Sequence, residues 1–141
     1  MLFIEMKIIL KKTFLLVSFT LIASCGDVGI DDNQAICTYI SGVGTTQVTG
    51  PITAAVNEEI TLTTTFSVAN NCGTFYMFNE TNGSNNDKNI TINARFDGCN
   101  CNNIPVVKTE PYKFKAISAG VYNLKFKKTN TEFITHTITV S

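Results

Sequence analysis

Apolar and polar residues alternate with a period of two along most of the chain after residue 46, which limits the folds open to it. In residues 59–69 (EITLTTTFSVA), Ile60, Leu62, Phe66 and Val68 share one face with Thr64, and Thr or Ser fills the other. The same alternation recurs in four further segments, whose apolar members are Ile90, Ile92, Ala94 and Phe96; Tyr112, Phe114 and Ala116; Tyr122, Leu124 and Phe126; and Ile134, Ile138 and Val140. This pattern is typical of antiparallel strands that bury one face and expose the other.

Short strands separated by turn residues predict a sandwich of two sheets. Adding residues 47–52 and 74–80 to the segments above gives about seven strands, with turns at Asn70-Asn71 and at residues 82–86. Thr, Ile, Val, Phe and Tyr favour strands, and Asn with Gly favours turns. We therefore expect an all-β domain over residues 46–141, an antiparallel two-sheet sandwich of about seven strands.

Two local motifs resemble those of immunoglobulin-like sandwiches. Residues 118–122 (SAGVY) lead directly into the strand with Leu124 and Phe126, as in the tyrosine corner before the penultimate strand. Residues 50–60 resemble the first strands of such domains and the turn between them. The resemblance implies an immunoglobulin-like fold in which the Tyr122 hydroxyl bonds to nearby backbone. The chain departs from the pattern in having no Trp, and in placing its cysteines away from the usual inter-sheet positions.

The first 25 residues have the features of an export signal. Lys7, Lys11 and Lys12 precede an apolar stretch at residues 13–23 that is too short to span a bilayer. The stretch ends in Ile22-Ala23-Ser24-Cys25, which resembles the lipobox of bacterial lipoproteins. This resemblance implies that residues 1–24 are removed as a signal peptide. It also implies that Cys25 carries a diacylglyceryl group and that its new amine is acylated, for example by palmitate. A freely secreted chain is the alternative.

Residues 25–45 are expected to form the lipidated cysteine and a tether. Within it, residues 26 to about 35 (GDVGIDDNQA) have no apolar periodicity, and Asp27, Asp31 and Asp32 make them acidic. An acidic run after the lipidated cysteine resembles an export signal to the outer face of the outer membrane, although here it is interrupted. A solvated spacer is the other interpretation. We expect a lipid-anchored protein of the cell envelope, in the outer membrane, with the leaflet left open.

The four remaining cysteines predict two disulfides. Cys37, Cys72, Cys99 and Cys101 form an even set in an exported domain. Partners in a hairpin have residue numbers with a constant sum, and pairing Cys72 with Cys99 centres the turn between Asn85 and Asn86. That pairing is preferred, and it leaves Cys37 to form a disulfide with Cys101. A disulfide between Cys72 and Cys101 remains the alternative. Zinc is disfavoured because the chain lacks the paired C-x₂₋₄-C spacing of structural zinc sites, so no metal is expected.

The sequence carries no recognisable catalytic constellation. His136 is the only histidine, and its alternation with Ile134 and Ile138 favours a satisfied inward or edge position. No nucleophile elbow and no glycine-rich phosphate loop is present, so we expect neither an enzyme nor a cofactor other than the lipid on Cys25. The balance of 11 Lys and Arg against 11 Asp and Glu argues against nucleic acid as a partner.

Two surfaces are candidates for binding. Lys113 and Lys115 in one predicted strand, and Lys125 and Lys127 in the next, would form a basic stripe if the two strands shared a sheet. Consecutive strands in different sheets would split the stripe, and lysines that simply keep the sheet soluble are the plainer interpretation. Tyr76 precedes the Asn-rich loop at residues 79–86 and could offer an aromatic platform to a glycan. Strict alternation there predicts that either Phe75 with Met77, or Tyr76 with Phe78, faces the core.

These features together predict a lipid-anchored, non-catalytic binding or accessory module of the cell envelope. It would meet the membrane through its lipid, and an envelope protein or a glycan through its loops and strand edges. The alternative is a structural subunit of an envelope assembly that pairs through an exposed strand edge. The sequence leaves the ligand and the oligomeric state open.

Overall fold

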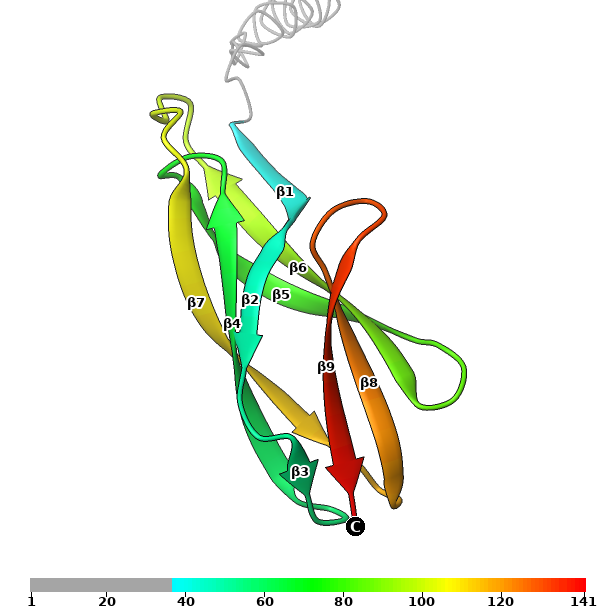
Figure 1. Cartoon of the computed structure of the whole chain (residues 1–141). Helices are drawn as coiled ribbons and strands as arrows, with labels where there is room; N and C mark the ends of the chain where they lie inside the picture. The colour runs from blue at the N-terminus through cyan, green and yellow to red at the C-terminus, as the bar shows by residue number, and fades with distance from the viewer. Residues whose placement is uncertain (1–36) are drawn as a thin grey trace, which may run out of the picture. The chain divides into compact units, whose positions relative to one another are not determined.

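The computed structural model describes residues 37–141, and every regular element in that range is a strand (Figure 1). The strands are β1 (Thr38–Val43), β2 (Thr45–Thr49), β3 (Thr53–Ala54), β4 (Glu59–Val68), β5 (Gly73–Asn82), β6 (Asp87–Asp97), β7 (Val106–Lys115), β8 (Gly120–Lys127) and β9 (Phe133–Val140). The all-β prediction is confirmed, with nine strands in place of about seven. None of the described residues belongs to a helix long and apolar enough to cross a membrane.

The strands form two sheets, as the alternation predicts. The smaller sheet has the order β2-β4-β7, and the larger has the order β1-β6-β8-β9-β3 with β5 also paired to β6. In the larger sheet β6 has β5 along one side, and β1 and then β8 along the other. Most pairs are antiparallel, but β6 pairs with β8, and β3 with β9, in parallel.

The core lies between the two sheets and consists of the apolar faces that the alternation predicts. Leu62 and Phe66 of β4 have no exposed surface, and neither do Ile92 of β6 and Leu124 and Phe126 of β8. Two polar residues, Thr45 and Thr64, are also fully buried. The Thr64 hydroxyl donates to the carbonyl of Glu110 at 2.8 Å, which satisfies it, whereas the Thr45 hydroxyl has no hydrogen-bond partner among the described residues.

The tyrosine corner forms as the resemblance implies. The Tyr122 hydroxyl donates to the backbone carbonyl of Ser118 at 2.9 Å and lies 3.0 Å from the Ser118 hydroxyl. Tyr122 also packs edge-on against Phe114 of the other sheet, with ring centroids 5.4 Å apart. The corner therefore fixes the turn between β7 and β8 to the core.

Strand β1 and the start of β2 lie ahead of residue 46, in the segment assigned from sequence to the tether. Tyr39, Ser41 and Val43 alternate there and pair with the apolar face of β6, where Tyr39 stacks on Phe96 at 4.7 Å. Six residues with one Gly and no charge give too short an alternation to predict a strand from sequence. Residues 38–43 form a strand because they pair with the edge of β6 through backbone hydrogen bonds.

A β-bulge in β5 breaks the alternation expected around Tyr76. The register with β6 shifts between Phe75 and Met77, so one extra residue is accommodated there. As a result Phe75 and Phe78 both pack on the core, whereas Tyr76 and Met77 are 48% and 45% exposed. The sequence prediction that one alternating pair would be core is therefore wrong, because it assumed an uninterrupted period of two.

Candidate functional site

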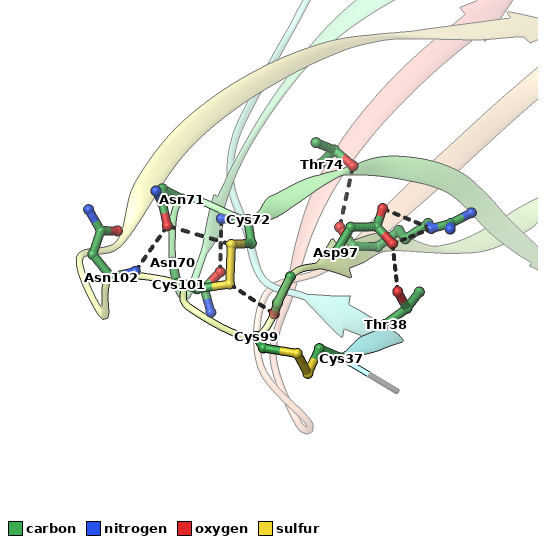
Figure 2. The surroundings of a disulfide bond; sticks show 12 residues. Cys37, Thr38, Asn70, Asn71, Cys72, Thr74, Asp97, Cys99, Cys101 and Asn102 are labelled. Atoms are coloured by element: carbon green, nitrogen blue, oxygen red, sulfur yellow. Dashed lines mark hydrogen bonds and ion pairs between the residues drawn. A yellow bond between two sulfur atoms is a disulfide. The ribbon is translucent and has the colours of Figure 1, made fainter. Parts of the chain in front are cut away.

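Two disulfides lie at the end of the sandwich where the described chain begins (Figure 2). They join Cys37 to Cys99 and Cys72 to Cys101, with Cα atoms 4.9 Å and 5.7 Å apart. Two bridges are as predicted. The preferred pairing of Cys72 with Cys99 and Cys37 with Cys101 is wrong, and Cys72–Cys101, which the spacing left open, is the one that forms.

The path of the chain after β6 explains the pairing. The Asp97 amide donates to the Cys72 carbonyl, so Asp97 rather than Cys99 lies opposite Cys72. The chain then turns at Gly98, whose φ of 129° suits glycine, and the Gly98 amide donates to the Cys37 carbonyl at 2.9 Å. This turn brings Cys99 to β1. The constant-sum prediction failed because the register beyond the β5 bulge pairs Gly73 with Phe96, a sum of 169 in place of 171, and because β6 ends at Asp97.

Asparagine and aspartate side chains hold the loops around the disulfides (Figure 2). The Asn71 side-chain oxygen accepts from the Asn102 amide, and the Asn70 oxygen accepts from the Cys72 amide, both at 3.1 Å. The Asp97 carboxylate accepts hydrogen bonds from the side chains of Arg95 and Thr38. These bonds, that of Arg95 most of all, lower the pKa of the Asp97 carboxyl. These polar groups therefore stabilise the loops.

The four lysines of the predicted basic stripe do not lie on one sheet. Lys113 and Lys115 belong to β7 in the smaller sheet, whereas Lys125 and Lys127 belong to β8 in the larger one. The stripe is therefore split, as in the alternative that consecutive strands change sheet. The positions of the four lysines in the sequence do not indicate which sheet each strand joins, so the split could not be predicted from them.

Two of these lysines are already held by carboxylates. Lys113 and Glu59 pair across β7 and β4 at 2.8 Å, which raises the pKa of Lys113 and lowers that of Glu59. Lys125 donates to Asp87 across β8 and β6, and this bond is the main cause of a lowered Asp87 pKa. Within residues 37–141, Lys127 has no acidic group at ion-pair distance.

Tyr76 and the tip of the Asn-rich loop are not brought together. Tyr76 lies inside β5, which continues to Asn82, and the turn follows at residues 83–86. At about 3.3 Å per residue the two are roughly 20 Å apart. A hollow of about 210 Å³ beside the turn is lined by Asn82, Asn86 and Tyr122 among others, but not by Tyr76. Tyr76 therefore lies away from the turn, and its role in binding a glycan stays a prediction.

Cys25, the predicted lipidation site, lies outside the described residues. His136 lies in β9, and its ring has a hydrogen-bond partner. The Nε2 atom of His136 is 2.9 Å from the Pro51 carbonyl, and His136 is the residue of β9 opposite Leu124. Its ring connects the last strand to the segment before β3. The structure thus gives this histidine a hydrogen-bonded structural position of the kind that the sequence favoured.

A hollow at the end of β1 is the feature that sequence reasoning missed. It measures about 310 Å³ and is lined by residues 42–44 and 127–130, and we call it the β1 notch. A Cβ on Gly44 would lie 2.5 Å from the Lys128 carbonyl oxygen, so only glycine lets the two segments approach this closely. Both cations of the lining, Lys127 and Lys128, come from the β8–β9 hairpin. Because β1 and that hairpin are 84 residues apart, no local pattern signals the notch.

Comparison of the chain with protein families, with curated proteins and with solved structures finds no match. Over residues 37–141, no three His, Cys, Asp or Glu side chains are grouped in a way that could hold a metal ion. What this chain binds therefore has to be inferred from its own surface: the exposed bulge at Tyr76, the strand edges and the β1 notch.

Proposed function

We propose that this chain is a lipid-anchored protein of the bacterial cell envelope, placed in the outer membrane, and that it acts as a non-catalytic binding module for a protein or a glycan. Cys25 is the proposed lipid attachment site. It precedes Cys37, the first residue of the described domain, by twelve residues, a length that spans at most about 40 Å. Such a link would keep the domain close to the bilayer.

The observation that carries this proposal is the position of the two disulfides. Both lie at the end of the sandwich where the described chain begins (Figure 2), so within residues 37–141 the disulfides leave the other strand edges and the loops at the other end without a covalent cross-link. Disulfides persist in oxidising compartments such as the periplasm and the cell surface, which agrees with an exported protein. A stapled domain with open edges is suited to hold a partner near a membrane.

The first test is the intact mass of the protein extracted from membranes with detergent, before and after alkylation of free thiols. The proposal requires a chain that begins at Cys25, carries acyl chains and has no thiol that reacts without reduction. A chain that begins elsewhere and lacks lipid would overturn the anchor. Alkylated cysteines in the unreduced protein would contradict the compartment.

The binding role is tested by photo-crosslinking in the intact envelope. A photoreactive residue is placed at Tyr39, at Tyr76 or at Ile117, which is 82% exposed at the turn after β7. One defined adduct, absent when the reactive residue is at Lys115, is the expected outcome. Equal yields of many adducts from all four positions would contradict a specific binding module.

A structural subunit that pairs through a strand edge is the second candidate. The observation in its favour is that the larger sheet ends at β1, which within residues 37–141 pairs with β6 alone. The last strand is a poor candidate for this role, because β9 lies between β8 and β3 at its C-terminal end. In an assembly of this kind a partner strand would continue the sheet.

A further inference from the structure

Two of the longest edge strands are protected against pairing with another chain. Strand β7 has Pro111 near its middle, which lacks an amide hydrogen, and it carries Lys108, Lys113 and Lys115. Strand β5 has the bulge at Tyr76. Charges, proline and bulges are the usual means by which proteins keep strand edges from pairing. Both strands therefore resist the addition of a partner strand.

Strand β1 has none of these protections. Its register with β6 is unbroken from Thr38 to Val43, and its sequence TYISGV contains neither a charge nor a proline. Tyr39 and Ile40 are 53% and 51% exposed. Its hydrogen-bonding edge on the side away from β6 is unpaired among the described residues. β1 is an uncharged edge with an unbroken register, and it offers a template for one more strand.

The β1 notch closes one end of the space beside this edge. β1 pairs with residues 92–97 of β6 and β8 pairs with residues 87–90, both on the same side of β6. The space next to β1 therefore continues toward the hairpin between β8 and β9, which lies beside the end of β1 (Figure 1). A strand added to β1 would end against residues 127–130 of that hairpin.

The charge at this end favours an acidic group. The lining contains Lys127 and Lys128 and no carboxylate. Lys128 is 3.4 Å from Glu132, whereas Lys127 has no ion pair in the described part of the chain. A carboxylate in the notch would lie beside Lys127, whose ammonium group has no ion pair in the described part of the chain, and beside the polar residues Thr129 and Asn130.

We propose that an extended segment of a partner protein adds to β1 as a further strand and places an acidic side chain in the β1 notch. The segment is uncharged over about six residues, the length of β1, with Asp or Glu next to them. Backbone hydrogen bonds along β1 hold the segment, and Lys127 selects its acidic end. This inference rests on the proposed function as a binding module, for which it names the surface and the partner.

A second copy of the chain fits this surface less well. If β1 paired with β1 of another copy, the added strand would carry no charge at either end of TYISGV to meet Lys127. The charge of the notch would then be unmatched. A partner with its own acidic residue satisfies both the edge and the notch.

Synthetic peptides with blocked ends test the inference on the full, lipidated chain in detergent micelles. Each peptide has six alternating Thr and Val residues between two Glu, two Gln or two Lys residues, so either strand direction is allowed. Backbone amide shifts of the isotope-labelled protein report where a peptide binds. We expect the Glu peptide to shift residues 38–43 while β5 and β7 stay unchanged. The Lys peptide should bind about three- to five-fold more weakly.

Two controls separate strand addition from plain charge attraction. N-methylation of alternate amides in the Glu peptide removes its backbone donors but keeps its charge, and it should abolish the shifts in β1. Lys127→Gln should remove the preference for Glu over Gln. Lys115→Gln is the matched control, because Lys115 is also a strand lysine but belongs to the other sheet, and it should leave the preference intact.

Absence of shifts in β1 with every peptide at millimolar concentration overturns the inference, and so does binding that N-methylation leaves unchanged. Concentration-dependent self-association that alters residues 38–43 without peptide would assign the edge to a second copy and likewise overturn it. An envelope crosslink from Tyr76 with no peptide effect on β1 would reject this inference and leave the proposed function standing. A chain that has no lipid and gives no envelope crosslink, but still shows the peptide shifts, would reject the envelope anchor and leave the strand addition to β1 standing.

Discussion

Tyr122 and Tyr112 both lie in the core, but only the hydroxyl of Tyr122 is hydrogen-bonded within the described chain. Burial raises the pKa of Tyr112, and the charge of Glu80 adds to this effect. Tyr122→Phe should lower the free energy of unfolding by about 1 kcal/mol, because it leaves the Ser118 carbonyl without its donor. Tyr112→Phe, the matched control, should leave it unchanged or raise it. Urea denaturation measures both, and equal losses would contradict the tyrosine corner.

The contact between β1 and the β8–β9 hairpin depends on a missing side chain at Gly44. Gly44→Ala places a methyl group 2.5 Å from the Lys128 carbonyl, so backbone must move and the unfolding free energy should fall by about 1–3 kcal/mol. Gly42→Ala meets two side-chain atoms, the Thr91 methyl group at 3.3 Å and the Asn93 oxygen at 3.6 Å, and should cost less. Thermal unfolding of the two variants compares them. A larger loss for Gly42→Ala would show that the hairpin does not rest on Gly44.

At the scale of single elements, the bulge in β5 decides which side chains stabilise the sandwich. Phe78 packs against Phe75 and Tyr112, with ring centroids 4.8 Å and 5.1 Å away, whereas Met77 faces solvent. Phe78→Ala should therefore lower the unfolding free energy by about 2–4 kcal/mol, and Met77→Ala by less than about 0.5 kcal/mol. Chemical denaturation checks this. The reverse order would place the bulge elsewhere in the strand.

The parallel pair of β6 and β8 is joined by the ion pair of Asp87 and Lys125. Because the folded chain lowers the Asp87 pKa below its ordinary value of 3.8, the folded state binds a proton less readily than the unfolded state. The stabilisation is therefore present above the ordinary pKa and is lost as the pH falls through the lowered one. We expect the urea midpoint to be constant above about pH 5 and to decrease below about pH 4.

Asp87→Asn should make that decrease shallower, since it removes one of the carboxyls responsible. Glu110→Gln serves as the control, because the Glu110 side chain forms no ion pair in the described part of the chain. Parallel pH profiles for the wild type and Asp87→Asn would show that the Lys125 contact adds nothing to stability.

A strand could be predicted from sequence where its apolar-polar alternation is long enough. β4, β6, β7 and β8 are eight to eleven residues long, and the apolar faces predicted in them, within residues 60–68, 90–96, 112–116 and 122–126, are buried. The first half of β7 lacks apolar alternation and was not predicted. β1 is too short for its pattern to be distinguished from a tether, and the bulge at Tyr76 has no glycine or proline to mark it. A long alternating pattern predicts a strand even when one position is irregular. A short strand forms only beside a neighbouring strand, and the sequence does not indicate which strand that is.

The candidate sites were harder to predict, because they depend on contacts between distant segments. The basic stripe required Lys113 and Lys125 to share a sheet, and strand order is set by packing of the whole chain. The disulfide pairing depended on a turn at Gly98 that follows β6 directly. The β1 notch joins residues 42–44 to residues 127–130, and Lys127 was singled out from sequence for a different surface.

At the scale of the whole molecule, the disulfides fix the loops that connect β1, β5 and β6. Peptide mapping without reduction should recover Cys37 joined to Cys99 and Cys72 joined to Cys101. Cys37 and Cys99 changed together to Ser should lower the unfolding free energy by roughly 4 kcal/mol on the loop-entropy model. The same pair of changes at Cys72 and Cys101 closes a shorter loop and should cost slightly less. Recovery of Cys72 joined to Cys99 would contradict the described path after β6.

The bond between Cys37 and Cys99 also determines how the domain would respond to mechanical force. If the chain is anchored at Cys25 and a bound partner pulls on the domain, the force enters the domain at Cys37. Without the bond, such tension would open the hydrogen bonds between β1 and β6 one after another, starting at Thr38. With it, the load passes covalently from Cys37 to the segment after β6, and β1 is spared from unzipping. The edge that we propose to hold a partner would then stay intact under the tension that the partner itself produces.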